Sequence, residues 1–271
     1  MTIPTTSTTA PALPIREYQY HHPVTLADYY SRPCLQIGCP SPVHSVTLDL
    51  LDVTEWLRQE RPEWLQASPA DPVPAPALAP SPIDLTRALA TEGWMTDLEL
   101  AYLARTAQRS RQIVEVGAWM GRSTCALAAN APDGASVWAV DTWLGSPEHQ
   151  DMLRQRPAGW LQQQFLANTA GLPVIPVRMA SVDAARLRQQ LQLPPVDLVF
   201  IDGGHDYDSV RADIAAWQPL LASGGILCGH DFTEAWDGVR RAVREMVPQF
   251  RVVEGTAIWT TEAAGAAGAA G

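Results

Sequence analysis

The stretch that decides the fold is residues 113–124, which read I-V-E-V-G-A-W-M-G-R-S-T. An apolar run with one carboxylate, Glu115, stops at Gly117, and a second glycine, Gly121, precedes a helix-like segment at residues 123–129. This order predicts a strand, a tight turn and a helix N-terminus, by which α/β folds hold nucleotide-like ligands. The spacing is G-x-x-x-G, which fits a G-x-G-x-x-G dinucleotide site poorly.

Strands and helices alternate after this stretch. Further apolar runs at residues 136–140, 174–177, 196–201 and 225–228 predict strands, and helical patterns occupy residues 96–109, 181–190, 206–221 and 235–247. The first of these helices is expected to begin with a Thr-x-x-Glu capping box formed by Thr96 and Glu99. A hairpin is expected at residues 250–260. We therefore predict an α/β fold with a Rossmann-like, mostly parallel seven-stranded sheet, helices on both faces and a C-terminal antiparallel hairpin.

The rest of the chain divides by composition. Residues 1–67 are expected to form an N-terminal arm and a helical extension, with the helix at residues 47–64 carrying Trp56 and Trp64. Residues 68–82 are a proline-rich linker, residues 83–262 the folded domain, and residues 263–271 a low-complexity tail expected to be disordered. An arm with exposed tryptophans favours a homo-oligomer.

Composition restricts the class of partner. The chain has 271 residues, is 46% hydrophobic and carries a net charge of −10, which argues against nucleic-acid binding. No run of 18 apolar residues predicts a membrane span, and the first residues lack the features of a signal peptide. We therefore expect a cytoplasmic protein that acts on neither nucleic acid nor membrane.

Polar residues follow the predicted strands, where ligands bind in open α/β sheets. Asp141 lies 20 residues after Gly121, a spacing at which a carboxylate accepts hydrogen bonds from ribose hydroxyls. Ser181 follows the third strand, where it borders an adenine ring, caps the next helix, or does both.

A second polar group follows the fourth and fifth strands. It comprises Asp202, His205, His230 and Asp231. If these strands are neighbours, the four side chains share one rim, which suits Mg²⁺ or another divalent cation. His205 is also a candidate general base. The alternative is a polar rim without metal or catalysis.

Three blocks of sequence carry a resemblance: residues 113–124, V-W-A-V-D-T-W-L-G-S at residues 137–146, and D-L-V-F-I-D-G-G-H-D-Y-D-S-V-R-A-D-I at residues 197–214 with its continuation G-G-I-L-C-G-H-D-F. Residues 93–260 resemble the class I S-adenosylmethionine-dependent methyltransferases. The branch is the one related to macrolide and antibiotic sugar O-methyltransferases and cephalosporin-hydroxylase-like proteins.

The resemblance implies a role for each matching residue. Glu115 and Gly117 would lie at the methionine end of the cofactor, and Gly121 would support the turn. Asp141 would hold the ribose with Thr142 and Trp143 beside it, and Ser181 would border the adenine. In metal-dependent members, residues at the positions of Asp202 and Asp231 bind Mg²⁺, and a histidine at the position of His205 is the base. His230 stands where those members have a second carboxylate. The acceptor pocket would be flanked by Trp94, Trp143 and Trp160, unless these side chains pack in the core or in a lid.

We therefore expect an enzyme that uses S-adenosylmethionine to O-methylate a small molecule or sugar, with a possible divalent metal. One alternative is a nicotinamide-dependent oxidoreductase, against which the missing G-x-G-x-x-G and the absence of lysine argue. The other is a catalytically silent S-adenosylmethionine-binding or scaffold subunit, in which the N-terminal region would carry the function.

Overall fold

The computed structural model describes residues 35–38, 45–48, 82–190 and 193–262. Residues 35–38 and 45–48 are the strands β1 (Leu35–Gly38) and β2 (Ser45–Leu48), which pair antiparallel. The helix predicted at residues 47–64 is therefore wrong at its start, because Thr47 and Leu48 belong to β2. The β-branched residues of Ser-Val-Thr-Leu favour a strand. The rest of that helix, the arm, the linker up to residue 81 and the tail lie outside the described residues.

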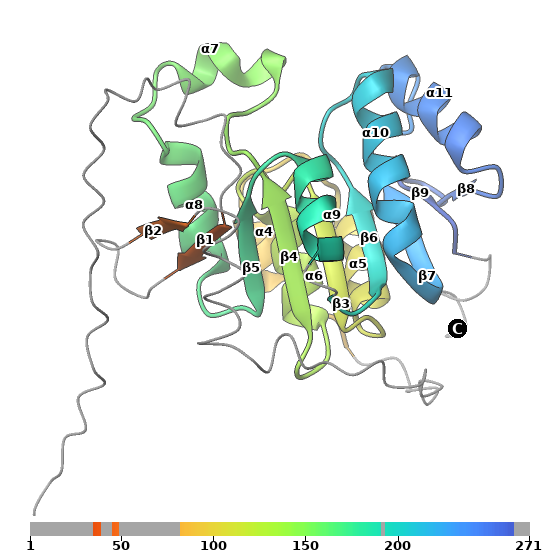
Figure 1. The fold of residues 1–271 in the computed structure, drawn as a ribbon, viewed down its shortest axis with the longest axis horizontal. Coiled ribbons are helices and arrows are strands. Elements are labelled where there is room, and N and C mark those ends of the chain that lie inside the picture. The colour runs from red at the N-terminus through yellow and green to blue at the C-terminus, as the bar shows by residue number, and fades with distance from the viewer. Residues whose placement is uncertain (1–34, 39–44, 49–81, 191–192, 263–271) are drawn as a thin grey trace, which may run out of the picture. The chain divides into compact units, whose positions relative to one another are not determined.

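The main sheet has seven strands in the order β5-β4-β3-β6-β7-β9-β8 (Figure 1). Five are parallel: β3 (Gln112–Val116), β4 (Ser136–Asp141), β5 (Val174–Arg178), β6 (Val196–Ile201) and β7 (Leu221–Gly229). The short strands β8 (Arg251–Val252) and β9 (Trp259–Thr260) pair antiparallel, and β9 runs antiparallel to β7. The predicted Rossmann-like sheet with a C-terminal hairpin is confirmed. The order reverses at β3, the point where such sheets bind ligands.

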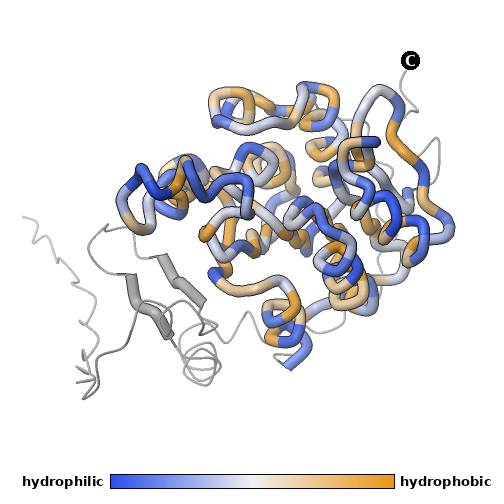
Figure 2. The backbone as a smooth tube through the Cα atoms, turned by 90° about the horizontal axis from the view of Figure 1, so that it is seen from above, coloured by the Kyte–Doolittle hydropathy of each residue, from blue (hydrophilic) through white to orange (hydrophobic). Residues whose placement is uncertain are grey.

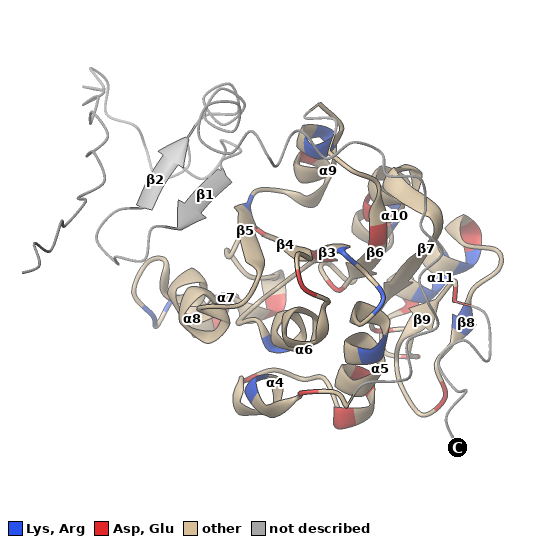
Figure 3. Cartoon of the chain, turned by 90° about the horizontal axis from the view of Figure 1, so that it is seen from below, with Lys and Arg blue, Asp and Glu red and all other residues tan. Residues whose placement is uncertain are grey.

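Helices cover both faces of the sheet (Figure 3). On one face a hydrophobic cluster, to which β3 contributes Ile113, includes residues of α4 (Thr86–Ala90), α5 (Asp97–Ala107) and α6 (Arg122–Asn130). On the other face a second hydrophobic cluster, to which β3 contributes Val114 and Val116, includes residues of α9 (Ser181–Gln190), α10 (Tyr207–Trp217) and α11 (Asp237–Met246). Side chains therefore alternate along β3, as a strand buried on both faces requires. Hydrophobic and hydrophilic residues accordingly intermingle along the helices in Figure 2.

The segment between β4 and β5 holds three short elements. They are the 3-10 helix η1 (Pro147–His149), α7 (Gln150–Leu153) and α8 (Trp160–Thr169). Phe165 on α8 packs against Trp143 in a third hydrophobic cluster. Among the described helices, none is both long and apolar enough to cross a membrane.

Two predicted helix ends need correction. The helix expected to reach residue 221 ends at Trp217, and a 3-10 helix with Pro219 at its second position, η2 (Gln218–Leu220), leads into β7. Proline lacks the amide that an α-helix needs here. Ser181 is the first residue of α9, not its cap. The Thr96 capping box at the start of α5 is confirmed, with Glu99 as its partner.

Candidate active site

A cavity of about 860 Å³ opens where the five parallel strands, β3 to β7, end. Eight residues singled out from the sequence line it: Gly117, Asp141, Thr142, Ser181, Asp202, His205, His230 and Asp231. Glu115, Gly121 and Trp143 do not line it. The convergence of eight residues from the ends of five parallel strands makes this cavity the candidate active site.

The turn after β3 is shaped by Gly117. Its φ of 86° is unfavourable for other residues, and a Cβ here would lie 2.1 Å from the carbonyl oxygen of Asp202. Gly121, with φ of 90°, precedes α6 and packs against Thr169 and Phe165. Gly117 therefore lets two strand ends approach each other, whereas Gly121 supports the turn from behind.

Asp141 holds this turn in place. Its Oδ2 accepts hydrogen bonds from the amides of Ala118 and Trp119, both at 2.9 Å, and its Oδ1 accepts one from the amide of Trp143 at 2.7 Å. Burial raises the pKa of Asp141, although these amides oppose the shift. The amide of Thr142 contributes as well, so backbone donors engage most of the roughly four acceptor positions of this carboxylate.

Glu115 and Trp143 lie behind the turn. The Glu115 side chain is buried and accepts a hydrogen bond from the Thr124 hydroxyl, and burial raises its pKa to about 8. Trp143 packs on Phe165 with ring centroids 4.8 Å apart, and its indole N–H donates to the carbonyl of Trp119 at 2.9 Å. Both side chains support the turn without facing the cavity.

Asp202, His230 and Asp231 form a compact cluster in which one ligand atom of each lies within 4.8 Å of the others. His230 Nδ1 is 3.3 Å from Asp231 Oδ1 and 3.6 Å from Asp202 Oδ1. Burial raises the pKa of Asp202 to about 7. Burial also disfavours charged His230, but its contacts with Asp231 and Glu99 outweigh that effect and raise its pKa to about 10.

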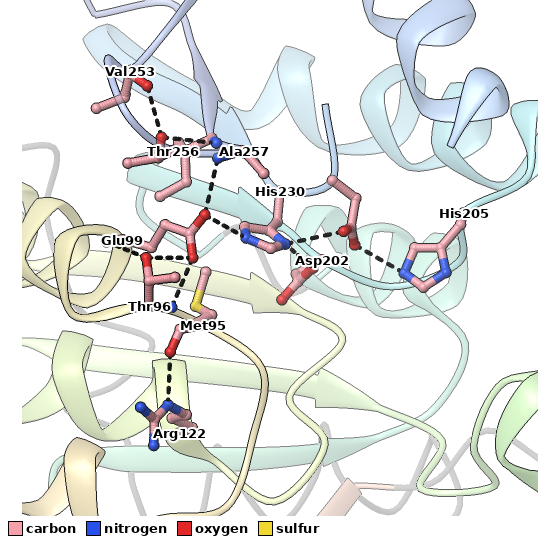
Figure 4. Close-up of polar contacts among 12 residues, drawn as sticks. Met95, Thr96, Glu99, Arg122, Asp202, His205, His230, Val253, Thr256 and Ala257 are labelled. Atoms are coloured by element: carbon pink, nitrogen blue, oxygen red, sulfur yellow. Dashed lines mark hydrogen bonds and ion pairs between the residues drawn. The ribbon is translucent and has the colours of Figure 1, made fainter. Parts of the chain in front are cut away.

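Glu99 connects this cluster to two other parts of the chain (Figure 4). Its Oε1 lies 3.1 Å from His230 Nε2 and accepts the amide of Ala257 at 2.9 Å. Its Oε2 accepts the amide of Thr96 at 2.8 Å, which completes the capping box. The pKa of Glu99 falls to about 2, because these hydrogen bonds outweigh the effect of burial.

His205 lies between two carboxylates. Its Nε2 is 3.0 Å from Asp231 Oδ2, and its Nδ1 is 3.2 Å from Glu148 Oε1. The hydrogen bond with Asp231 raises the pKa of His205. The ring packs on Trp236 with centroids 4.1 Å apart. To accept a proton from a ligand, His205 must release one of its two carboxylates.

Ser181 lies at the other end of the cavity. Its hydroxyl accepts a hydrogen bond from the indole N–H of Trp217 at 2.8 Å. Asp213, which also lines the cavity, is buried, and burial raises its pKa to about 6, opposed by a hydrogen bond with Ser181. Thr142 lines the cavity beside Asp141, and its hydroxyl accepts the amide of Leu144 at 3.3 Å.

Sequence reasoning missed the site roles of Glu99, Glu148 and Asp213. Asp213 carried a signal, because it interrupts the apolar face that Val210, Ile214 and Trp217 share. Glu99 was identified only as a helix cap. Glu148 lies in a segment without any motif, so only the fold reveals its contact with His205.

Comparison with known proteins gives one domain match. Residues 114–232 match the model of the Methyltransf_24 family, described as a methyltransferase domain. The sequence-based prediction of a methyltransferase is confirmed for this part of the chain. An uncharacterised protein of Sinorhizobium fredii, y4gI, is 30% identical over 131 residues, which are 46% of this chain and 13% of that protein. The match thus spans a small part of that relative.

Solved structures are more distant. CalS11, a calicheamicin methyltransferase, is 19% identical with a TM-score of 0.47, and the match covers 82% of this chain and 86% of that one. An O-methyltransferase from Bacillus cereus in complex with SAH is 18% identical with a TM-score of 0.46, covering 68% of this chain and 92% of that one. At these values neither structure supports an argument about substrate.

Proposed function

We propose that this chain, whose residues 114–232 match a methyltransferase domain, transfers a methyl group from S-adenosylmethionine to a hydroxyl of a small molecule or sugar. One observation carries the proposal. A single cavity is lined both by the glycine turn with Asp141 and by the pair of His205 and Asp231. The same cavity therefore offers a place for the nucleoside of the cofactor and a proton acceptor for the hydroxyl that is methylated.

The residues around the turn suit the cofactor. The residues that would contact the cofactor directly are Gly117, Asp141, Thr142 and Ser181, with Asp202 beside the turn. Asp141 lines the cavity, so we expect its carboxylate to accept a ribose hydroxyl in addition to the amides of the turn. Glu115, Gly121 and Trp143 would act from behind by keeping the turn in shape. When bound, S-adenosylmethionine supplies a methyl group already activated on a sulfonium, so the protein mainly aligns the reactants.

His205 is the proposed base. It would take the proton of the acceptor hydroxyl while the oxygen takes the methyl group, which leaves a neutral thioether as the second product. Glu148 and Asp231 contact its two ring nitrogens, so one of them must move away for the acceptor hydroxyl while the other keeps the ring oriented. Either carboxylate would stabilise the imidazolium once the proton has moved.

The cluster of Asp202, His230 and Asp231 fits a divalent cation. Two carboxylates and one imidazole nitrogen lie close enough to share an ion. Glu99 Oε1 lies 3.1 Å from His230 Nε2, which leaves Nδ1 facing the two aspartates, as in sites where a carboxylate orients a metal-binding histidine. Bound there, a cation would lower the pKa of the acceptor hydroxyl.

The test is binding followed by turnover. Calorimetry should detect S-adenosylhomocysteine binding to the wild type and to His205→Gln, whereas methyl transfer should fall at least about 100-fold in His205→Gln. No binding by the wild type would refute the proposal. Binding without methyl transfer to any acceptor would instead favour a silent binding subunit.

The organisation of the whole chain stays a prediction. The arm with its extension (1–67), the linker (68–82), the domain (83–262), the tail (263–271) and the homo-oligomer are proposed on sequence alone. Light scattering on the full chain and on a truncation that begins at residue 83 tests the oligomer.

A further inference from the structure

Three aromatic side chains meet at one side of the cavity. Trp94, Trp119 and His149, which we call the aromatic wall, all line the cavity. Their ring centroids are 5.3 Å apart for Trp94 and Trp119, 5.2 Å for Trp94 and His149, and 4.3 Å for Trp119 and His149. The rings come from three separate loops, so the cluster depends on the fold and not on one motif.

The protein holds these rings in place at some cost. Trp94 is 69% exposed, which leaves a large apolar surface in water. Trp119 has a φ of 47°, an unfavourable backbone conformation for a bulky residue. Strain of this kind is concentrated at sites that bind ligands. Both features indicate that the wall is completed by a ligand.

Arg122 fixes the segment that carries Trp94. Its guanidinium donates to the carbonyls of Thr91 at 2.7 Å and Met95 at 3.1 Å, which flank Trp94. It also donates to the carbonyl of Ala88 at 3.2 Å. Arg122 is the only arginine among the described residues that line the cavity, and the chain has no lysine. Its charge is therefore engaged by backbone oxygens.

Carboxylates also line the cavity. Asp202, Asp231 and Glu148 line it near His205. Glu148 and His149 are neighbours on η1, so this short element contributes to both the wall and the contact with His205. A ligand between the wall and His205 would contact aromatic rings and carboxylates together. These three carboxylates outnumber the two imidazoles, His205 and His230, so charge repulsion disfavours an anionic ligand there.

We propose that the aromatic wall is the acceptor subsite, and that it binds a planar aromatic ring that is neutral or cationic and carries the hydroxyl to be methylated. The inference rests on the proposed function and narrows its acceptor class. Flat rings gain from offset stacking on indole and imidazole faces, and a cationic group gains further from tryptophan. A phenolic hydroxyl has a pKa of about 10, so imidazole can deprotonate it more readily than an ordinary alcohol.

The test measures the affinity of defined probes with S-adenosylhomocysteine already bound. The probes are 4-methylcatechol (neutral), dopamine (cationic), 3,4-dihydroxybenzoate (anionic) and methyl rhamnoside, a sugar. We expect the neutral and cationic rings to bind at least about 10-fold more tightly than the other two. Trp94→Ala and His149→Ala should each weaken ring binding by about 3- to 10-fold, from the usual strength of an aromatic pair.

Controls separate the subsite from the cofactor site. Leu98→Ala removes an exposed apolar side chain outside the cavity and should leave every affinity unchanged. Tighter binding of the sugar or of the benzoate would overturn the inference, as would unchanged ring affinity in both wall variants. Loss of S-adenosylhomocysteine affinity in Trp94→Ala with unchanged ring affinity would assign the wall to the cofactor. A wild type that does not bind S-adenosylhomocysteine would refute the proposed function itself.

Discussion

Replacing Glu99 tests whether one carboxylate supports both a helix and the site. Glu99 is 4% exposed and serves the amides of Thr96 and Ala257 and the imidazole of His230. Glu99→Ala leaves these three donors without their acceptor. An unsatisfied buried donor costs about 1–3 kcal/mol, and water can reach some of the space left behind, so we expect a loss of about 3–5 kcal/mol in the free energy of unfolding.

Two matched variants show how much the separate contacts of Glu99 contribute to this loss in the free energy of unfolding. Thr96→Ala removes the hydroxyl of the capping box but keeps the contacts of Glu99 with the amide of residue 96, with Ala257 and with His230, so it should cost about 1 kcal/mol. Glu99→Gln keeps the shape and one acceptor oxygen, so it should cost about 2 kcal/mol. Urea unfolding followed by circular dichroism measures all three. If Glu99→Ala costs no more than Thr96→Ala, the contacts with Ala257 and His230 contribute nothing and the reasoning is refuted.

The pH dependence of the same variants gives an independent check. The pKa of Glu99 is about 2 in the folded protein and 4.5 ordinarily. A carboxyl whose pKa is lowered by folding stabilises the fold when the pH is above its ordinary pKa. This stabilisation disappears as the pH falls from the ordinary pKa to the pKa in the folded protein. The stability difference between the wild type and Glu99→Gln should therefore be constant above about pH 5 and shrink below pH 4.5.

Three further predictions concern the cavity. Gly117→Ala should weaken S-adenosylhomocysteine binding at least about 10-fold in calorimetry, because its Cβ would lie 2.1 Å from the Asp202 carbonyl; unchanged affinity would contradict the turn's role. The pKa of Asp213 is raised to about 6, so Asp213→Asn should stabilise the protein by up to about 3 kcal/mol above pH 6 and not below pH 3.8; equal stability at pH 7 would contradict this. Mn²⁺ should bind the wild type, and Asp231→Asn at least about 10-fold more weakly, in calorimetry after EDTA dialysis; equal binding would remove the proposed metal site.

The sheet could be predicted because its signals are local. Each parallel strand is an apolar run, and the parallel arrangement brings their ends to one edge, so the residues expected to share one rim were Asp202, His205, His230 and Asp231. The error at Thr47 has a local cause too. The few apolar residues around Thr47 fit either a helix or a strand, and the pairing of residues 45–48 with β1 favours the strand.

The contacts of the cavity loops could not be predicted, because no sequence pattern indicates which residues the loop side chains meet in the folded protein. Glu148 reaches His205 from a segment between β4 and β5 that has no motif. Trp94 was weighed as part of an acceptor pocket together with Trp143 and Trp160, but it is Trp119 and His149 that it meets. Loop side chains find partners only through the tertiary fold.

Glu99 shows how a local signal can conceal a second role. The capping box explained the residue fully, so no unexplained feature pointed to the contact with Ala257, which is 158 residues away in the sequence. The capping geometry directs one oxygen to Thr96, which leaves the other oxygen for partners outside the helix. In this protein those partners are the loop before β9 and His230. The start of α5 is therefore placed by the same carboxylate that orients a side chain of the candidate active site, so stability and site geometry should change together in its variants.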